Sequence, residues 1–381
     1  METSQAPVVN TRGLHSQALD LLRFPLAIII VAVHAFPNLT DGVTFAGETI
    51  RLGNHSIFEG VLNFIYAFMR HQSVPIYFFI SGYVFFLGAE FSKETYVRKL
   101  KNRVKTLLIP YLIWNTLFVA SQIVINLPAL VKNPAVWNWG SLPSAFWTYD
   151  GGLFSTTGAT GSDIYPINVP LWFLRNLMIV VLCTPAIYHL IRKFRHYPVI
   201  LLGVAWLVFT LIKPADNELP AGFLSAFFFF SWGAYMSICK KDMVAEFGRF
   251  FKPSMILYPT LGMLCMLSAY VCPEARHVIK QINIFVGLLF AYNLAVWLLQ
   301  KGYCRAGGLL PASSFFIYVS HMAIIGVITA AYFTLFGMPL NAERWPRMFL
   351  TFALTVTISL TAFWLLKRYT PSLLRVLTGR K

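Results

Sequence analysis

The stretch Ala18-Leu-Asp-Leu-Leu-Arg-Phe-Pro-Leu-Ala-Ile-Ile-Ile-Val-Ala-Val-His-Ala-Phe36 decides the class of this protein, because it is long and apolar enough to cross a bilayer yet contains an arginine and a histidine. Arg23 and His34 are 11 residues apart, about three helical turns, so both lie on nearly the same helix face, roughly 16 Å apart along the axis. Ionisable groups inside a membrane span are costly and mark a functional site by default. The alternative is that Arg23 extends to the lipid headgroups while His34 lies near the opposite interface.

The composition gives the same class for the whole chain. Of its 381 residues, 57% are hydrophobic and only 12% are charged, whereas soluble globular proteins carry about 25% charged residues. We therefore predict one all-α transmembrane domain over residues 1–381, a polytopic membrane protein with about ten transmembrane helices. The expected spans are residues 18–37, 73–90, 106–126, 171–191, 198–213, 221–239, 254–272, 279–300, 312–336 and 347–367.

For four segments outside these spans, the sequence also predicts a location or a role. Residues 1–17 are polar and predict a cytoplasmic tail, and residues 368–381 predict a basic cytoplasmic tail. Residues 127–170 form the longest external loop, rich in Trp and Gly, which suits a lid or an acceptor-binding loop as well as Trp side chains at headgroup depth. Residues 56–70 are apolar but short, and we interpret them as an interfacial or re-entrant helix on the outer side, because a span there would break the alternation of loop charge.

The distribution of Lys and Arg orients the chain. The net charge is +16. If the spans alternate, one side carries a total charge of +17 and the other carries −2, the positive side being formed by residues 91–105, 192–196, 240–252, 300–306 and 367–381. The positive-inside rule therefore predicts that both termini are cytoplasmic. It also accounts for the excess of basic residues, so that no basic surface is left for nucleic acid.

Two further classes of feature are not expected. The first residues, Met1 to Gln5, lack the basic region and the small-residue cleavage site of a signal peptide, so the first helix should be a retained span. The five cysteines are scattered and form no CxxC pair, so we expect neither a disulfide framework nor a metal site.

A basic cluster precedes the expected span 106–126. It contains Arg98, Lys99, Lys101, Arg103 and Lys105. Basic residues at this place anchor a helix to anionic lipid, at about 1 kcal/mol each. The alternative is a phosphate clamp for a nucleotide-bearing cytosolic donor, because arginine presents a planar fork to phosphate oxygens.

Two later polar groups lie inside expected spans. Trp172 and Arg175 lie near the outer start of the span 171–191, where an arginine either extends outwards or lines the mouth of a cavity. His321 lies within the span 312–336, where it is either a hydrogen-bonded structural residue or part of a catalytic site.

These signals coincide with a known family. Leu19-Asp-Leu-Leu-Arg23 followed by His34 is similar to the first-helix signature of the acyltransferase-3 family, membrane O-acyltransferases of which many acylate surface polysaccharides and other envelope glycans. Four later elements resemble that family in the same order, namely Pro75 to Phe86 (its FFISG-type second helix), Arg103 to Trp114 (its basic junction to the third helix), Leu171 to Leu177 (its LWFL element) and Phe316 to His321 (its late histidine element). Each motif is short, but five in order over nearly the whole chain are specific.

One position departs from the family pattern. Members often carry a second arginine three positions after the residue that matches Arg103, and this chain has Thr106 there. Lys105 or Arg98 would be the substitutes.

The resemblance implies an acyltransferase in the bacterial inner membrane. Its donor would be acyl-CoA from the cytoplasm, with acetyl-CoA as the default, and its acceptor a hydroxyl of a surface polysaccharide or a lipid-linked glycan. Membrane lipids and polysaccharide-biosynthesis proteins would be its other partners, and no bound cofactor or metal is expected. The implied site residues are His34 and Arg23 for catalysis, Arg98, Arg103 and Lys105 for the donor, and Asp20, Trp172, Arg175 and His321 as supporting or acceptor-binding residues.

The residues allow a mechanism for such a transfer. A neutral histidine has an ordinary pKa of about 6.5, so His34 is suited to take the proton of an attacking hydroxyl near neutral pH. An acyl-histidine intermediate is a variant of this hypothesis. Asp20, three residues before Arg23, is expected to pair with it.

Two other classes of function remain open on the sequence alone. A transporter or flippase for a glycolipid or polysaccharide would also carry polar residues along one span, although no internal repeat of two half-domains is visible. A non-catalytic membrane subunit of an export system would fit if Arg23 and His34 proved dispensable.

Overall fold

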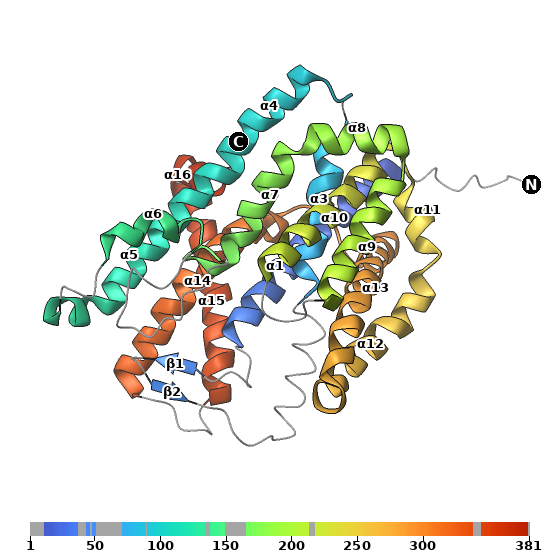
Figure 1. Cartoon of the computed structure of the whole chain (residues 1–381). Coiled ribbons are helices and arrows are strands. Elements are labelled where there is room, and N and C mark those ends of the chain that lie inside the picture. Colours follow the sequence, from blue (N-terminus) through green and yellow to red (C-terminus); the bar gives the residue numbers. More distant parts are fainter. Residues whose placement is uncertain are drawn as a thin grey trace, which may run out of the picture.

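The structure is a computed structural model that describes residues 11–36, 43–45, 48–50, 71–88, 90–133, 138–148, 165–212, 218–337 and 344–379. These residues form a helical bundle, with one short antiparallel pair of strands, β1 (Val43–Phe45) and β2 (Glu48–Ile50), at one end (Figure 1). The all-α class predicted from the sequence is confirmed, apart from this hairpin.

The described helices account for most of the chain. In chain order they are α1 (Thr11–Ala35), α3 (Ser73–Phe86), α4 (Lys93–Arg103), the π-helix η1 (Val104–Leu108), α5 (Ile109–Lys132), the 3-10 helix η3 (Trp139–Ser141), α6 (Leu142–Ala145), the 3-10 helix η4 (Val169–Leu171), α7 (Trp172–Leu182), α8 (Thr184–Phe194), α9 (Tyr197–Ile212), α10 (Glu218–Ile238), α11 (Met243–Gly248), α12 (Phe251–Val271), α13 (Pro273–Gln300), α14 (Leu309–Phe336), α15 (Arg344–Tyr369) and α16 (Pro371–Thr378).

Five helical segments of the described chain are long and apolar enough to cross a membrane. They are Gly13–Ala35, Lys93–Ile125, Ala275–Gln300, Leu309–Phe336 and Pro346–Tyr369. A sixth is the bent pair of α7 and α8, and three shorter apolar helices are Ser73–Phe86, Tyr197–Ile212 and Gly222–Ile238. The chain therefore has the make-up of a multi-pass helical membrane protein. The number of about ten spans and the cytoplasmic position of the termini stay predictions.

The bend between α7 and α8 has a local cause. The two helices meet at Cys183 with an angle of 60°. Pro185 follows in the first turn of α8 and has no backbone N–H to donate to the carbonyl of Val181. The hydroxyl of Thr184 donates to that carbonyl instead, at 2.7 Å. The predicted span 171–191 is therefore a broken helix rather than a straight one.

The basic cluster is helical. Ser92 caps α4 by accepting from the backbone N–H of Thr95 at 3.2 Å, and Glu94 lies in the first turn, where a carboxylate is favourable. α4 continues without a break through η1 into α5. The third apolar segment thus begins at Lys93, whereas the sequence predicted a span beginning at 106, because hydropathy alone cannot extend a helix through a run of charged residues.

The expected tails and loops are partly described. Residues 11–17 belong to α1, and residues 371–378 form α16, so both expected tails contain helix next to the bundle. Residues 56–70, the expected interfacial helix, lie outside the described residues. Of the expected external loop 127–170, the structure describes the end of α5, residues 138–148 and residues 165–170.

α3 and α10 pack with their backbones in close contact. The reason is a glycine on each helix: a methyl group added at Gly82 would overlap the carbonyl of Phe230, and one added at Gly233 would overlap the carbonyl of Phe79. Small residues allow such an approach between membrane helices. The pair forms the centre of an aromatic core that includes Phe79, Phe229 and Phe230.

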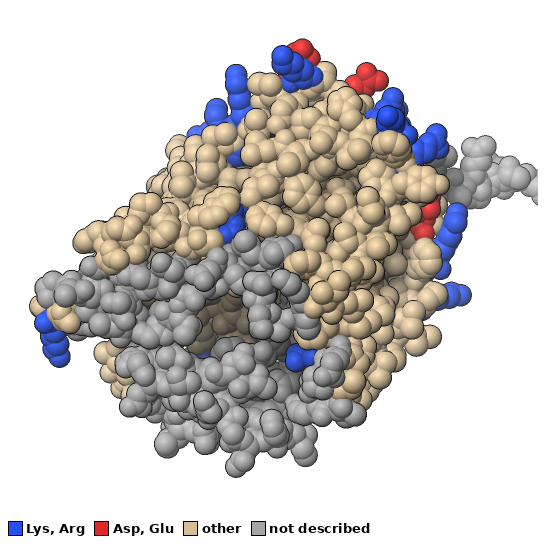
Figure 2. All heavy atoms as spheres, in the orientation of Figure 1, with Lys and Arg blue, Asp and Glu red and all other residues tan. Residues whose placement is uncertain are grey.

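The basic segments gather at one end of the bundle. Tyr96 on α4 donates to the carbonyl of Leu182 at the α7–α8 bend, at 3.1 Å, and His15 at the start of α1 contacts Asp242 before α11. Figure 2 shows Lys and Arg side chains along this end of the molecule, over α4 and α8. We refer to it as the basic end.

Candidate functional site

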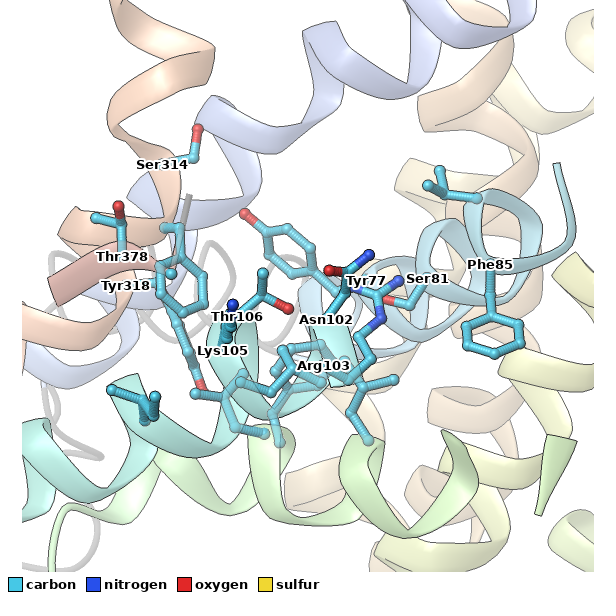
Figure 3. A pocket seen from close by; sticks show the side chains of 18 of the residues that line it. Tyr77, Ser81, Phe85, Asn102, Arg103, Lys105, Thr106, Ser314, Tyr318 and Thr378 are labelled. Carbon is cyan, nitrogen blue, oxygen red and sulfur yellow. The ribbon is translucent and has the colours of Figure 1, made fainter. Parts of the chain in front are cut away.

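A cavity of about 1140 Å³ lies between α1, α3, the α4–η1–α5 helix, α7, α14 and α16. Its described lining has no Asp or Glu, and it contains five basic residues, which are Arg23, Lys99, Arg103, Lys105 and Arg375. Figure 3 shows Arg103, Asn102 and Ser81 on one side of this space and Ser314 and Tyr318 on the other. The cavity is therefore a cationic chamber with apolar walls, suited to an anion attached to an apolar or extended group.

The α4–η1–α5 helix supplies three of the five basic residues. Lys99 and Arg103 are four residues apart and share a helix face. Lys99 donates to the carbonyl of Phe85, and the Phe85 ring lies under both cations, 5.0 Å from the Lys99 nitrogen and 5.9 Å from the guanidinium carbon of Arg103. These contacts with the end of α3 direct both side chains into the chamber.

The π-helix supplies the next cation. Lys105 and Thr106 both belong to η1, and both line the cavity. A π-helix widens one turn of a helix and occurs frequently at functional sites. Here it lies where the basic α4 becomes the apolar α5.

Arg23 lines the cavity from α1 and is held by two contacts. Its Nη1 donates to the Asp20 carboxylate at 2.9 Å, which is the pairing expected from the sequence. The hydroxyl of Tyr77 on α3 donates to the Arg23 backbone carbonyl at 2.6 Å. The first contact fixes the side chain, and the second fixes the helix at this level.

Two histidines lie close to a residue that lines the cavity. Tyr318 on α14 lines the cavity, and its hydroxyl donates to the carbonyl of Pro170. One turn further along α14 is His321, whose ring centroid lies 5.2 Å from that of His34 on α1. α1 and α14 are in extensive contact, so the two rings are brought together by a helix pair rather than by a loop.

The orientation of the His321 ring defines its hydrogen-bonding groups. The side chain is fully buried, and its Nδ1 lies 2.7 Å from the carbonyl of Tyr318. A carbonyl only accepts, so Nδ1 carries the proton and, in a neutral ring, Nε2 presents a lone pair. This buried Nε2 has no hydrogen-bond partner in the described part of the chain. A buried acceptor without a partner is unusual and calls for a functional explanation.

Arg175 and Trp172 lie away from this chamber. Arg175 is 1% exposed and donates to the carbonyl of Trp147 at 2.5 Å and to the Asn176 side chain at 3.2 Å. Its guanidinium also lies 5.2 Å from the Trp147 ring. Trp172 packs near Phe78. Arg175 therefore anchors residues 138–148, the described part of the expected external loop, onto α7.

The sequence-predicted site residues thus fall into three places. Arg23, Arg103 and Lys105 line one cavity, with Asp20 beside Arg23, and His34 and His321 form a pair one turn beyond it. Trp172 and Arg175 lie on another side of α7. Arg98 is absent from the described lining. Arg98 is five residues before Arg103, so the two side chains point in directions about 140° apart around the helix axis. Lys99 is four residues before Arg103, and its direction differs from that of Arg103 by only about 40°.

Several lining residues were not among the site residues expected from the sequence. Lys99 belongs to the basic cluster but was not among the implied donor residues, although its i,i+4 relation to Arg103 would have selected it. Arg375, Tyr77 and Tyr318 carried no such signal, because only the packing of α16, α3 and α14 brings them to the cavity.

Comparison with family models assigns the chain to a family. Residues 16–364 match the model of an acyltransferase domain, Acyl_transf_3, which covers nearly the whole chain. The chain belongs to the acyltransferase-3 family. It is therefore an acyltransferase, and the resemblance seen in the five short motifs is confirmed.

The chain is also similar to a named relative of comparable length. The chain is 25% identical, over 379 residues, to the succinoglycan biosynthesis protein ExoH of Rhizobium meliloti (strain 1021), covering 96% of this chain and 92% of the relative. No solved structure matches the chain.

Proposed function

We propose that this acyltransferase moves an acyl group from cytosolic acyl-CoA to a hydroxyl of a surface polysaccharide or lipid-linked glycan, in the bacterial inner membrane. The observation that carries the proposal is the cationic chamber, which leads from the basic end to within one helical turn of the His34–His321 pair. A donor with phosphates at one end and a thioester at the other matches this order of groups.

The basic end of the bundle would face the cytoplasm under the positive-inside rule. Arg23, Arg103 and Lys105 would then meet the phosphates of the donor, with Arg103 able to bind two phosphate oxygens through its planar guanidinium. An extended pantetheine arm spans a distance comparable to the roughly 16 Å between Arg23 and His34 along α1. The thioester carbonyl would therefore reach the level of the histidines.

His34 would act as general base. It takes the proton from the acceptor hydroxyl as the oxygen attacks the thioester carbonyl, an ester bond forms, and the carbon–sulfur bond breaks. The thiolate of CoA leaves and takes up the proton that His34 accepted. His321, held by its Nδ1 to the backbone, would fix the position of His34 through the ring contact of 5.2 Å. Asp20 would keep the Arg23 side chain in place.

The acceptor class rests on the relative, which is named for the biosynthesis of succinoglycan. The acyl group can be identified by comparing donors, with acetyl-CoA tested first and succinyl-CoA second. Residues 138–148, anchored by Arg175, and Trp172 would lie on the acceptor side of the molecule.

The test combines cells and purified protein. Surface glycans are analysed by mass spectrometry from cells with the gene, without it, and complemented with His34→Ala. We expect one acyl mass increment per repeat to disappear without the gene and to return with the wild-type chain but not with the variant. In proteoliposomes, radiolabelled acetyl-CoA and succinyl-CoA should be compared as donors. Loss of the whole glycan, rescued equally by the variant, would contradict the proposal and favour a transporter.

A further inference from the structure

α16 is docked against the bundle rather than free of it. Leu374 and Thr378 are buried, and the indole N–H of Trp114 on α5 donates to the carbonyl of Leu377 at 2.9 Å. The helix also packs against α14 and α15. Because α16 contacts three helices of the bundle, it is a fixed part of the structure.

The close approach of α16 to the π-helix depends on glycine. Gly379 ends α16 with a φ of 62°, and a methyl group added there would overlap the Cα of Thr106. Any other residue at this position would be strained by its backbone conformation and would push α16 away from η1. The contact brings the end of α16 against the turn that carries Lys105.

Arg375 is the charged residue of α16 at the cavity. It lines the chamber together with Ser372 and Thr378, and its Nη2 donates to the Ser372 hydroxyl at 3.2 Å. No carboxylate within the described residues lies within 4.0 Å of its guanidinium, whereas Arg23 has Asp20. Lys99, Arg103 and Lys105 line the same space and also have no carboxylate within 4.0 Å among the described residues. Such a cluster repels itself unless an anion occupies it.

We infer that α16 is a wall of the donor site and that Arg375 binds a phosphate group of the acyl donor. This inference rests on the proposed function and adds to it a residue from a part of the chain far from the basic cluster in sequence. Arg375 lines the chamber from α16, and its hydrogen bond to Ser372 orients its guanidinium. The hydroxyls of Ser372 and Thr378 are further donors for phosphate oxygens.

The experiment measures binding to the purified full chain in nanodiscs. The probes are CoA and pantetheine, which share the thiol arm but differ in the phosphates. Arg375→Gln should weaken CoA binding about tenfold while leaving pantetheine binding unchanged. Arg368→Gln is the matched control, because Arg368 lies over the rings of Trp364 and Tyr369 and not in the described lining. Gly379→Ala, which keeps Arg375 but displaces α16, should weaken CoA binding as well.

The outcomes separate this inference from the proposed function. If the wild-type chain and Arg375→Gln bind CoA equally, the inference is wrong and the proposed donor stands. If Arg375→Gln weakens CoA and pantetheine alike, the effect is not on phosphate and the inference is also wrong. If the wild-type chain binds no CoA but binds a polyprenyl diphosphate, the phosphate comes from a lipid, and both the proposed donor and the inference fail.

Discussion

His34 on α1 and His321 on α14 face each other with ring centroids 5.2 Å apart and an angle of 38° between the rings. The two residues are 287 positions apart in the sequence, and contact between their helices brings them together. Their place one turn beyond Tyr318 puts them at the end of the chamber where a donor held by its phosphates would present its thioester.

His34→Ala should reduce acyl transfer by a factor of about 10² to 10⁴, because in the proposed mechanism it removes the base that accepts the hydroxyl proton. Donor binding should be unchanged. The measurement is turnover of labelled acyl-CoA in proteoliposomes. His189→Ala, at an exposed position on α8, is the control and should retain full activity. Wild-type turnover by His34→Ala would show that the residue is structural.

His321→Phe should place a ring of similar size beside His34 that is no longer held by the Nδ1 hydrogen bond, so the position of His34 is no longer fixed. We expect kcat to fall at least tenfold with little change in the donor KM, because the variant loses the Nδ1 hydrogen bond to Tyr318 and the buried Nε2 acceptor. A pH profile of kcat should also change shape. If both kcat and the profile match the wild type, His321 only fills space.

Arg23→Gln should raise the donor KM about tenfold, because it removes a cation from the chamber. Asp20→Asn should have a smaller effect, since its partner is about one third exposed and the charge of Arg23 remains. Steady-state kinetics with varied acyl-CoA measure both. Arg305→Gln, at an exposed loop position, is the control. A larger effect for Asp20→Asn than for Arg23→Gln would reverse the assigned roles.

Gly82→Ala and Gly233→Ala should each lower the stability of the protein by about 1–3 kcal/mol, because the added methyl group overlaps the backbone of the facing helix. The measurement is thermal unfolding in detergent. Gly248→Ala is the matched control, because nothing lies within 4 Å of a methyl group added there. Equal melting temperatures for all three variants would mean that α3 and α10 are not in close contact.

Arg175→Leu should loosen residues 138–148. It leaves the carbonyl of Trp147 without its charged donor, at a cost of about 1–3 kcal/mol. We expect faster limited proteolysis within residues 138–148 and a higher acceptor KM, with the donor KM unchanged. Unchanged cleavage of this segment would show that Arg175 does not anchor it.

The sequence was sufficient for the class of fold and for part of the site. Low charge and long apolar runs have one physical solution, a helical bundle in lipid, and the short spacing from Asp20 to Arg23 fixes their contact within one helix. The same logic would have selected Lys99 over Arg98, because only Lys99 shares a face with Arg103.

Contacts between helices could not be derived in this way. Arg375 reaches the chamber only because Gly379 lets α16 approach η1, and Arg175 is buried only because residues 138–148 fold over it. Neither of these two contacts follows from a local sequence pattern. The continuous helix through Lys93 to Lys132 was also missed, since a π-helix has no distinct hydropathy signature.

The π-helix at Val104–Leu108 has a consequence for how this site can change by mutation. A π-turn holds one residue more than the α-helical turn it replaces. Deleting a single residue there would restore a regular helix and leave α4 and α5 in their present relative rotation, because the wide turn accommodates that one residue. The same deletion in a regular turn of α5 would rotate α4, with Lys99 and Arg103, by about 100° relative to the rest of the helix. The cationic wall should therefore tolerate the loss of one residue in the π-helix and not in the turns that follow it.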